Sequence, residues 1–127
     1  AGEDDSPIKW LQSLSDGDVA LPVVVPQTVK SNYNARLPEG EIALLETTDV
    51  ADLALLIVLS IPPAAPWDMT ANLRAPVVIN HKKRIGRQII TENEEYELRV
   101  PVLSDIMRES MRRKAVDEAS SQTAPEE

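Results

Sequence analysis

The sequence has no cysteine, no phenylalanine and a single histidine among its 127 residues. Without cysteine, disulfide bonds and thiolate metal sites are excluded. His81 is the one imidazole, and no carboxylates have the spacing of a metal site, so we expect neither a metal nor a cofactor. Because two Trp and two Tyr are the whole aromatic content, the core must be built from Val, Ile, Leu and Ala.

Long hydrophobic runs and catalytic glycine motifs are also missing. The longest apolar run, residues 53–63, is too short to span a bilayer, and the acidic start of the chain lacks the hydrophobic region of a signal peptide. We therefore expect a cytoplasmic protein of one domain. With four glycines and no phosphate loop or nucleophile elbow, we do not expect an enzyme. A small hydrolase is a weaker alternative, which requires His81 to lie beside a nucleophile.

The net charge of −8 is distributed unevenly. Residues 1–72 contain eleven acidic and three basic side chains, residues 73–116 contain ten basic and six acidic ones, and residues 117–127 contain four acidic ones. The three parts therefore carry −8, +4 and −4. An acidic first half repels nucleic acid at long range and attracts basic partners, whereas the basic part keeps a nucleic-acid hypothesis open.

Short β-rich segments separated by turns predict a mostly-β domain of five or six short strands. The predicted strands are residues 7–13, 19–25, 53–61, 76–80, 85–91 and 97–100, with a turn at 15–18 and a proline-rich loop over 63–70. The 53–61 run is apolar on both faces, which is typical of a central strand, whereas Pro22 indicates an edge strand or a bulge. Residues 76–91 predict a hairpin, and Pro101 ends the last strand.

Two helices are predicted. Residues 38–45 form a short helix, because a proline stands at its start and acids fill its first turn. Residues 104–116 form an amphipathic C-terminal helix with Ser104 as its N-cap. Its apolar stripe, which either docks on a partner or packs back onto the domain, consists of Leu103, Ile106, Met107 and Met111. We expect residues 1–6 and 117–127 to be disordered.

Three features of the sequence are candidate sites with two interpretations each. The basic cluster Lys82, Lys83, Arg84 and Arg87 is either a phosphate-binding patch or a solvated hairpin turn, and the lack of interleaved aromatic residues favours the turn. Trp10 and Trp67 are either ligand platforms or the large fillers of the core. The acidic run 92–95 is either a pair of acid/base carboxylates or a solvated loop, and the loop is favoured because adjacent residues of a strand point to opposite faces.

Three stretches resemble one protein family. They are IKWLQSLSDGDVALPVVVP (8–26), MTANLRAPVVINHKKRIGRQII (69–90) and NEEYELRVPV (93–102). Each resembles a segment of the flagellar assembly factor FliW family, and they occur in the family's order across residues 7–102. Each stretch alone is also ordinary β-hairpin chemistry, so the resemblance depends on the three occurring together.

The resemblance implies a small antiparallel β-barrel-like domain over residues 7–102, without catalysis. It also implies two partners, which are flagellin in the cytoplasm and the translational repressor CsrA. In the family, flagellin and CsrA compete, and the protein released from flagellin binds CsrA allosterically and relieves the repression of flagellin mRNA. Compared with the family pattern, this chain starts after an early strand pair, and residues 103–127 are an added helix and acidic tail.

Exposed polar residues inside the matching motifs are our candidates for partner binding in a protein that is a monomer when free. They are Gln12, Asn72 and Asn80, with the acids Asp16, Asp18 and Asp68 for electrostatic steering. Turn and bulge hydrogen bonding is the alternative role for these side chains. The alternative function is a small β-barrel RNA-binding module that uses the basic hairpin, residues 82–87.

Overall fold

The computed structural model describes residues 7–12 and 20–122, so the predictions for residues 1–6 and for the turn at 15–18 lie outside the described residues. The strands are β1 (Lys9–Gln12), β2 (Ala20–Val24), β3 (Leu53–Ser60), β4 (Thr70–Ala71), β5 (Val77–Asn80), β6 (Ile85–Gln88) and β7 (Val100–Pro101). The helices are α1 (Glu39–Leu44) and α2 (Asp105–Gln122), with the 3₁₀ turns η2 (Pro26–Thr28), η3 (Val50–Asp52) and η4 (Pro66–Asp68). The predicted inserted helix and the predicted hairpin are both confirmed.

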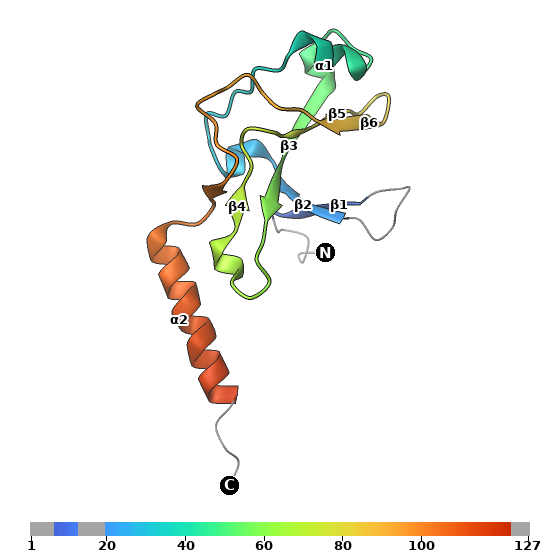
Figure 1. Ribbon diagram of the computed structural model, residues 1–127. Helices are drawn as coiled ribbons and strands as arrows, with labels where there is room; N and C mark the ends of the chain where they lie inside the picture. Colours follow the sequence, from blue (N-terminus) through green and yellow to red (C-terminus); the bar gives the residue numbers. More distant parts are fainter. Residues whose placement is uncertain (1–6, 13–19, 123–127) are drawn as a thin grey trace.

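The antiparallel sheet is organised around β3, which confirms the prediction of a central strand there. β3 pairs with β2 and also with both β4 and β5, and β1, β6 and β7 extend the sheet from these neighbours. Figure 1 shows the strands curling around one side of the molecule, with α1 at one end and α2 leaving the other. The mostly-β, barrel-like class is thus confirmed in the form of a curled half-barrel.

A bulge lets β4 and β5 pair with the same strand. Ala71 lies opposite Leu59 and Val77 lies opposite Leu56, so five residues, 72–76, occupy the space of two on β3. The Asn72 amide still donates to the Val58 carbonyl, and its side-chain Oδ1 accepts from the amides of Arg74 and Ala75 at 3.1 and 2.9 Å. This Asx turn fixes the bulge, and a bulge increases the local bend of the sheet.

The sheet places Pro22 differently from the prediction. β2 lies between β1 and β3, so it is not an edge strand. Pro22 pairs with Trp10 of β1, but the ladder to β3 begins only at Val23. Proline is tolerated at this position because the ladder to β3 does not extend to it, so its missing N–H leaves no hydrogen bond of that ladder unmade.

The core contains the two tyrosines rather than the two tryptophans. The Tyr33 and Tyr96 rings stack at 4.8 Å between centroids inside a cluster that includes Ile57, Leu59 and Leu73. The Tyr33 hydroxyl donates to the Leu73 carbonyl, and the Tyr96 hydroxyl accepts from the Asn34 amide, both at 2.8 Å. A second cluster, Leu45, Val78 and Ile89, joins α1 to the β5–β6 hairpin.

The end of the domain differs from the sequence-based prediction in three ways. The last strand is Val100–Pro101, not residues 97–100. It pairs with β4, whose Thr70 was predicted to be the last residue of the proline-rich loop and whose Ala71 was predicted to follow that loop. η4 forms inside that predicted loop. The C-terminal helix continues to Gln122 instead of ending near residue 116, so the prediction of disorder was wrong for residues 117–122. Helix-favouring residues between 113 and 119 explain the continuation.

The buried Tyr33 hydroxyl predicts an alkaline loss of stability. Burial, together with the nearby Tyr96, raises the pKa of Tyr33 to about 12. An unfolded tyrosine ionises near pH 10, so above that pH the unfolded chain releases a proton that the folded chain retains. We expect Tyr33 to contribute a fall of about 2 kcal/mol in unfolding free energy between pH 10 and 12, measured by urea denaturation.

The Tyr33→Phe variant is the matched control for this titration. It should lose about 1 kcal/mol at pH 7, because the Leu73 carbonyl loses its buried donor. Its stability should then fall less steeply than that of the natural chain between pH 10 and 12. If the unfolding free energies of the two proteins fall equally steeply between pH 10 and 12, Tyr33 ionises as freely in the folded state as in the unfolded one.

Candidate protein-interaction surfaces

The basic cluster at residues 82–87 lies on a tight hairpin turn. Asn80 and Ile85 are opposite each other, and residues 81–84 form the turn between them. The Arg84 amide donates to the Asn80 carbonyl at 2.8 Å, and Arg84 has a positive φ of 59°. The cluster is therefore presented by a closed turn, as the preferred sequence interpretation stated.

Two of the four cluster bases are paired with acids from the segment before β3. Lys82 contacts Asp52 of η3 at 3.2 Å, and Arg87 contacts Glu41 of α1 at 3.1 Å. The hydroxyl of Thr47, followed by Lys82, holds the pKa of Asp52 below its usual value. These pairs reduce the positive charge that the cluster could offer to a phosphate backbone.

Asn80 is a structural side chain at the base of this turn. It is only 2% exposed, so the prediction of Asn80 as an exposed residue was wrong. Its Nδ2 donates to the Leu45 carbonyl at the end of α1, and its Oδ1 accepts from the amides of Lys82 and Lys83. Asn80 thus connects the hairpin to α1. The alternative role, turn and bulge hydrogen bonding, describes both Asn80 and Asn72 in the structure.

The sequence analysis did not identify Asn93, which has a similar role. Its side chain is buried, accepts from the Arg36 amide at 2.6 Å and donates to the Asn34 carbonyl at 3.0 Å. It also donates to Glu95, and Arg36 lies 3.6 Å from the same carboxylate. A backbone hydrogen bond, followed by Asn93 and Arg36, lowers the pKa of Glu95. A lone Asn before two Glu residues was the available sequence signal, since Asn favours such local turns.

The β1–β2 hairpin carries an exposed apolar surface. Trp10 is 64% exposed, and Val25, directly after β2, is also exposed. Leu21 is exposed too, but it pairs with Leu11 and therefore lies on the opposite face of the hairpin from Trp10. Trp10 borders a groove of about 370 Å³ whose other lining residues are mainly apolar: Pro7, Lys9, Leu11, Val23, Val24, Val25, Thr28 and Leu56. We call this the Trp10 surface. Trp10 is therefore not a core filler, and of its two interpretations the ligand platform fits its position.

Three of the predicted partner-binding residues belong to the same hairpin. Gln12 is exposed at the end of β1, two residues after Trp10 and thus on the same face of the strand. Asp16 and Asp18 follow in the β1–β2 connection and lie outside the described residues. Asn72 and Asn80 occur elsewhere on the sheet. The predicted site is therefore not one cluster.

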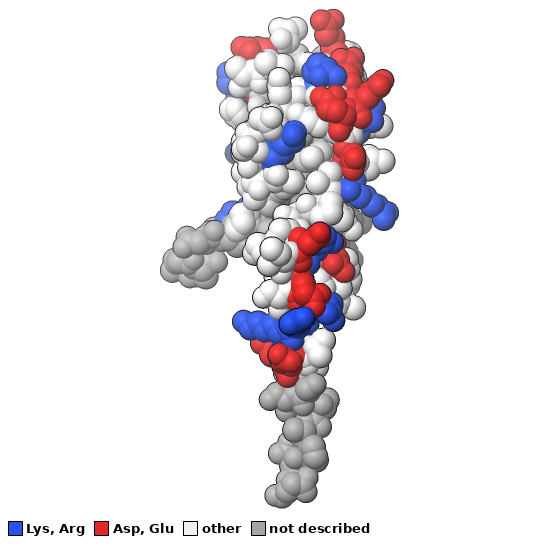
Figure 2. All heavy atoms as spheres, turned by 90° about the vertical axis from the view of Figure 1, so that its left-hand side faces the viewer, with Lys and Arg blue, Asp and Glu red and all other residues white. Residues whose placement is uncertain are grey.

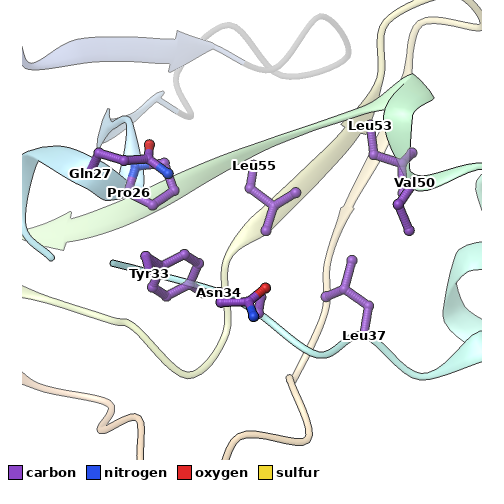
Figure 3. A pocket seen from close by; sticks show the side chains of 9 residues that line it. Pro26, Gln27, Tyr33, Asn34, Leu37, Val50, Leu53 and Leu55 are labelled. Atoms are coloured by element: carbon purple, nitrogen blue, oxygen red, sulfur yellow. The ribbon is translucent and has the colours of Figure 1, made fainter. Parts of the chain in front are cut away.

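A second groove, also of about 370 Å³, lies between β3 and the segment that crosses it. Figure 3 shows Leu53 and Leu55 of β3 on one side, with Tyr33 and Leu37 on the other. Val50 of η3 is exposed at one end. Tyr33 is part of the core cluster and is fixed by its hydrogen bond to Leu73, so the core forms one wall of this groove.

The sixth predicted residue, Asp68, lies at the contact between η4 and α2. It is exposed and stands 4.0 Å from Arg108 of α2. Trp67, half-buried, lines the hollow between these elements with Arg108 and Arg112. Acidic and basic side chains alternate along α2 in Figure 2, and Asp105–Arg108 and Glu109–Arg112 are pairs within the helix.

The predicted apolar stripe of α2 is largely open to solvent. Ile106 is 83% exposed, and Met107 and Met111 are exposed as well. The helix meets the domain mainly through η4, and Figure 1 shows the rest of it extending away from the sheet. Of the two interpretations of the stripe, packing back onto the domain is not what this structure shows.

Other kinds of site find little support in residues 7–12 and 20–122. No group of three or more acidic or histidine side chains there is arranged to hold a metal ion. No described helix is long and apolar enough to cross a membrane. His81 is exposed in the hairpin turn near Asp52 and Lys82, whereas the hydrolase alternative required a nucleophile beside it.

Comparisons with known proteins agree with one another. The family model described as FliW protein matches residues 1–102. "Flagellar assembly factor FliW" of Thermotoga maritima is 43% identical over 102 residues, covering 80% of this chain and 68% of that protein. The protein of the same name from Thermoanaerobacter pseudethanolicus is 37% identical over 103 residues, covering 81% and 68%. A crystal structure of the flagellar assembly factor FliW superposes with a TM-score of 0.71 at 29% identity, covering 80% of this chain and 72% of that one.

The contacts of Asn80 predict a large effect of its removal on stability. Asn80→Ala leaves the buried Leu45 carbonyl and two turn amides without their partner, so we expect a loss of about 2–4 kcal/mol in unfolding free energy by urea denaturation. Asn32→Ala, at an exposed asparagine, should change stability by less than about 0.5 kcal/mol. Similar small losses for both variants would contradict the assignment of Asn80 as the connection between hairpin and α1.

Proposed function

The chain belongs to the FliW family of flagellar assembly factors, and we propose that it works by binding two proteins in turn in the cytoplasm. One partner is flagellin. The other is the translational repressor CsrA, which the chain binds when no flagellin occupies it. Binding of CsrA then relieves the repression of flagellin mRNA. The proposal requires no cofactor, and the protein is a monomer when neither partner is bound.

The Trp10 surface is the observation that carries this proposal. A large aromatic side chain that is mostly exposed, beside an apolar groove, is typical of the energetic centre of a protein interface. Isolated exposed hydrophobic residues are ordinary, but here the exposed Trp10 and Val25 line the same groove. Gln12 stands at the margin, where polar residues usually surround such a centre.

The charge of the first half supports the choice of CsrA as a partner. A protein that binds RNA presents basic side chains, and an acidic partner is steered toward it and repels competing phosphates. Residues 1–72 supply the negative charge, and Asp16 and Asp18 belong to the same hairpin as Trp10. Asp68 is exposed farther along the chain, on η4. We propose these acids for steering and the Trp10 surface for affinity.

The mode of antagonism that we propose is allosteric. The chain would bind CsrA away from the bases that contact RNA and favour a state of CsrA with lower RNA affinity. Such coupling is reciprocal, so RNA would weaken the binding of CsrA to this chain by the same factor. Flagellin acts differently in this scheme, because it competes directly for the chain.

The RNA-binding alternative depends on the basic hairpin. Lys82 and Arg87 already contact Asp52 and Glu41, which leaves Lys83 and Arg84 as the exposed cluster bases without such a contact described. Two phosphate contacts give weak RNA binding, and its salt dependence is shallow compared with that of dedicated RNA-binding proteins. The structure therefore supports RNA binding less strongly than the sequence alone did.

Truncation of Trp10 should separate binding from folding. Trp10→Ala removes a mostly exposed side chain, so we expect a change of less than about 1 kcal/mol in unfolding free energy. The affinity for CsrA, and separately for a flagellin C-terminal segment, should fall at least about tenfold, as for an interface hot spot. Isothermal titration calorimetry with each partner measures both affinities.

Leu98→Ala is the matched control, because Leu98 is an equally exposed apolar residue on a different segment. It should leave both affinities within about twofold of the natural chain. If Trp10→Ala folds and binds both partners with unchanged affinity, the Trp10 surface is not the interface. Binding of RNA but of neither protein would favour the alternative function.

A further inference from the structure

One edge of the β5–β6 hairpin is open. Within the part of the chain that the structure describes, β6 pairs with β5 alone. The amides of Ile89 and Thr91 donate back to Pro76 and Arg74, toward the β5 side. Backbone groups alternate in direction along an antiparallel strand, so those of Gly86, Gln88 and Ile90 point outward.

The open stretch has a defined length. Further along the chain, the Glu92 amide donates to the Arg36 carbonyl at 2.8 Å, so the segment around Arg36 closes the edge there. Gly86 and Gln88 are exposed, and Ile90 is 67% exposed. The edge thus presents three alternate residues whose backbone groups face outward, which is enough to pair with a short extended segment.

On the sheet face beside this edge, Ile79 packs closely over Gly86. Ala54, Ile79 and Gly86 lie opposite one another on three neighbouring strands and therefore share a face. A Cβ atom on Gly86 would stand 3.0 Å from Ile79 Cγ1 and 3.2 Å from the Val78 carbonyl. Without a side chain at residue 86, Ile79 stays partly exposed. A large side chain on an added strand, opposite Gly86, could cover it.

The charge at one end of the edge is positive. The turn of residues 81–84 follows β5 directly, and its Lys83 and Arg84 are exposed. Lys82 and Arg87 are paired internally, and those pairs hold the turn against α1 and η3. An incoming segment therefore meets unneutralised positive charge at the turn, which favours acidic side chains at that end.

We propose that the β6 edge binds an extended acidic peptide segment of a partner protein as an added strand. Backbone groups of Gly86 and Gln88 pair with the segment. One large apolar side chain of the segment lies opposite Gly86 over Ile79, and acidic residues lie near Lys83 and Arg84. This site is separate from the Trp10 surface and goes beyond the proposed function, since its test requires neither flagellin nor CsrA.

A synthetic peptide tests the site on the full chain. The probe is a seven-residue peptide of β-forming residues with a central phenylalanine and two glutamates at one end. In ¹⁵N-labelled protein, the peptide should shift amide signals of residues 82–90 and slow the hydrogen exchange of Gly86 and Gln88 at least about tenfold. The same peptide with N-methyl groups on its pairing edge should do neither, because it cannot donate to the strand.

Two variants of one residue separate backbone pairing from side-chain contact. Gln88→Pro removes the outward amide at a position where an edge strand tolerates proline, and Gln88→Ala keeps the amide. Both lose the Gln88 hydrogen bond to the Ala75 carbonyl. Gln88→Pro should lose peptide binding at least tenfold relative to Gln88→Ala, and Lys83→Glu should weaken it in a salt-dependent manner.

Several results would overturn the proposal. They are equal binding of the natural and the N-methylated peptide, equal binding by folded Gln88→Pro and Gln88→Ala, and signal shifts centred outside residues 82–90. An RNA oligonucleotide that shifts the same signals and displaces the peptide would also overturn it and assign the hairpin to phosphate. The N-methylated peptide keeps the test decisive on the natural chain if Gln88→Pro does not fold.

Discussion

The architecture depends on one strand that serves two partners along the same edge. β3 is eight residues long, and β4 and β5 both pair with it, so the chain between them must bulge at residues 72–76. The side chain of Asn72 holds that bulge by accepting from two amides. The resulting bend directs β5 and β6 toward α1 and β4 toward β7, which gives the half-barrel in Figure 1 its curl.

Buried asparagines and internal ion pairs then determine which surfaces remain for partners. Asn80 joins the hairpin turn to α1, and Asn93 joins the 92–97 loop to the segment of Arg36. The basic cluster, which was the most conspicuous charged motif of the sequence, loses half of its charge to Asp52 and Glu41. What the fold leaves exposed is an apolar hairpin at Trp10, an unpaired edge at β6, and the outer stripe of α2. Protein contact is the function that these surfaces suit.

Local patterns predicted the elements better than the contacts. The apolar run of β3, the hairpin and the acidic first turn of α1 have signals within a few residues, and all three were found. Pro22 was misplaced because its tolerance depends on where the ladder to β3 starts, which is a long-range fact. The two interpretations of Trp10 stayed open for the same reason, since only the topology decides whether an aromatic side chain faces the core, as Tyr33 does, or the solvent, as Trp10 does. The acidic, polar composition after residue 116 predicted disorder, but the helix propensity of the residues around that point carries α2 on to Gln122.

The central claim is that flagellin and CsrA compete for this chain, and a competition titration tests it most directly. The chain is first saturated with CsrA in the presence of a labelled flagellin mRNA leader, and a flagellin C-terminal segment is then added. Fluorescence anisotropy of the labelled RNA reports how much CsrA is released to it. At a segment concentration of about one hundred times its Kd, the apparent affinity for CsrA should fall about a hundredfold and RNA binding by CsrA should return. A ternary complex of all three proteins, with the RNA still excluded, would contradict the account.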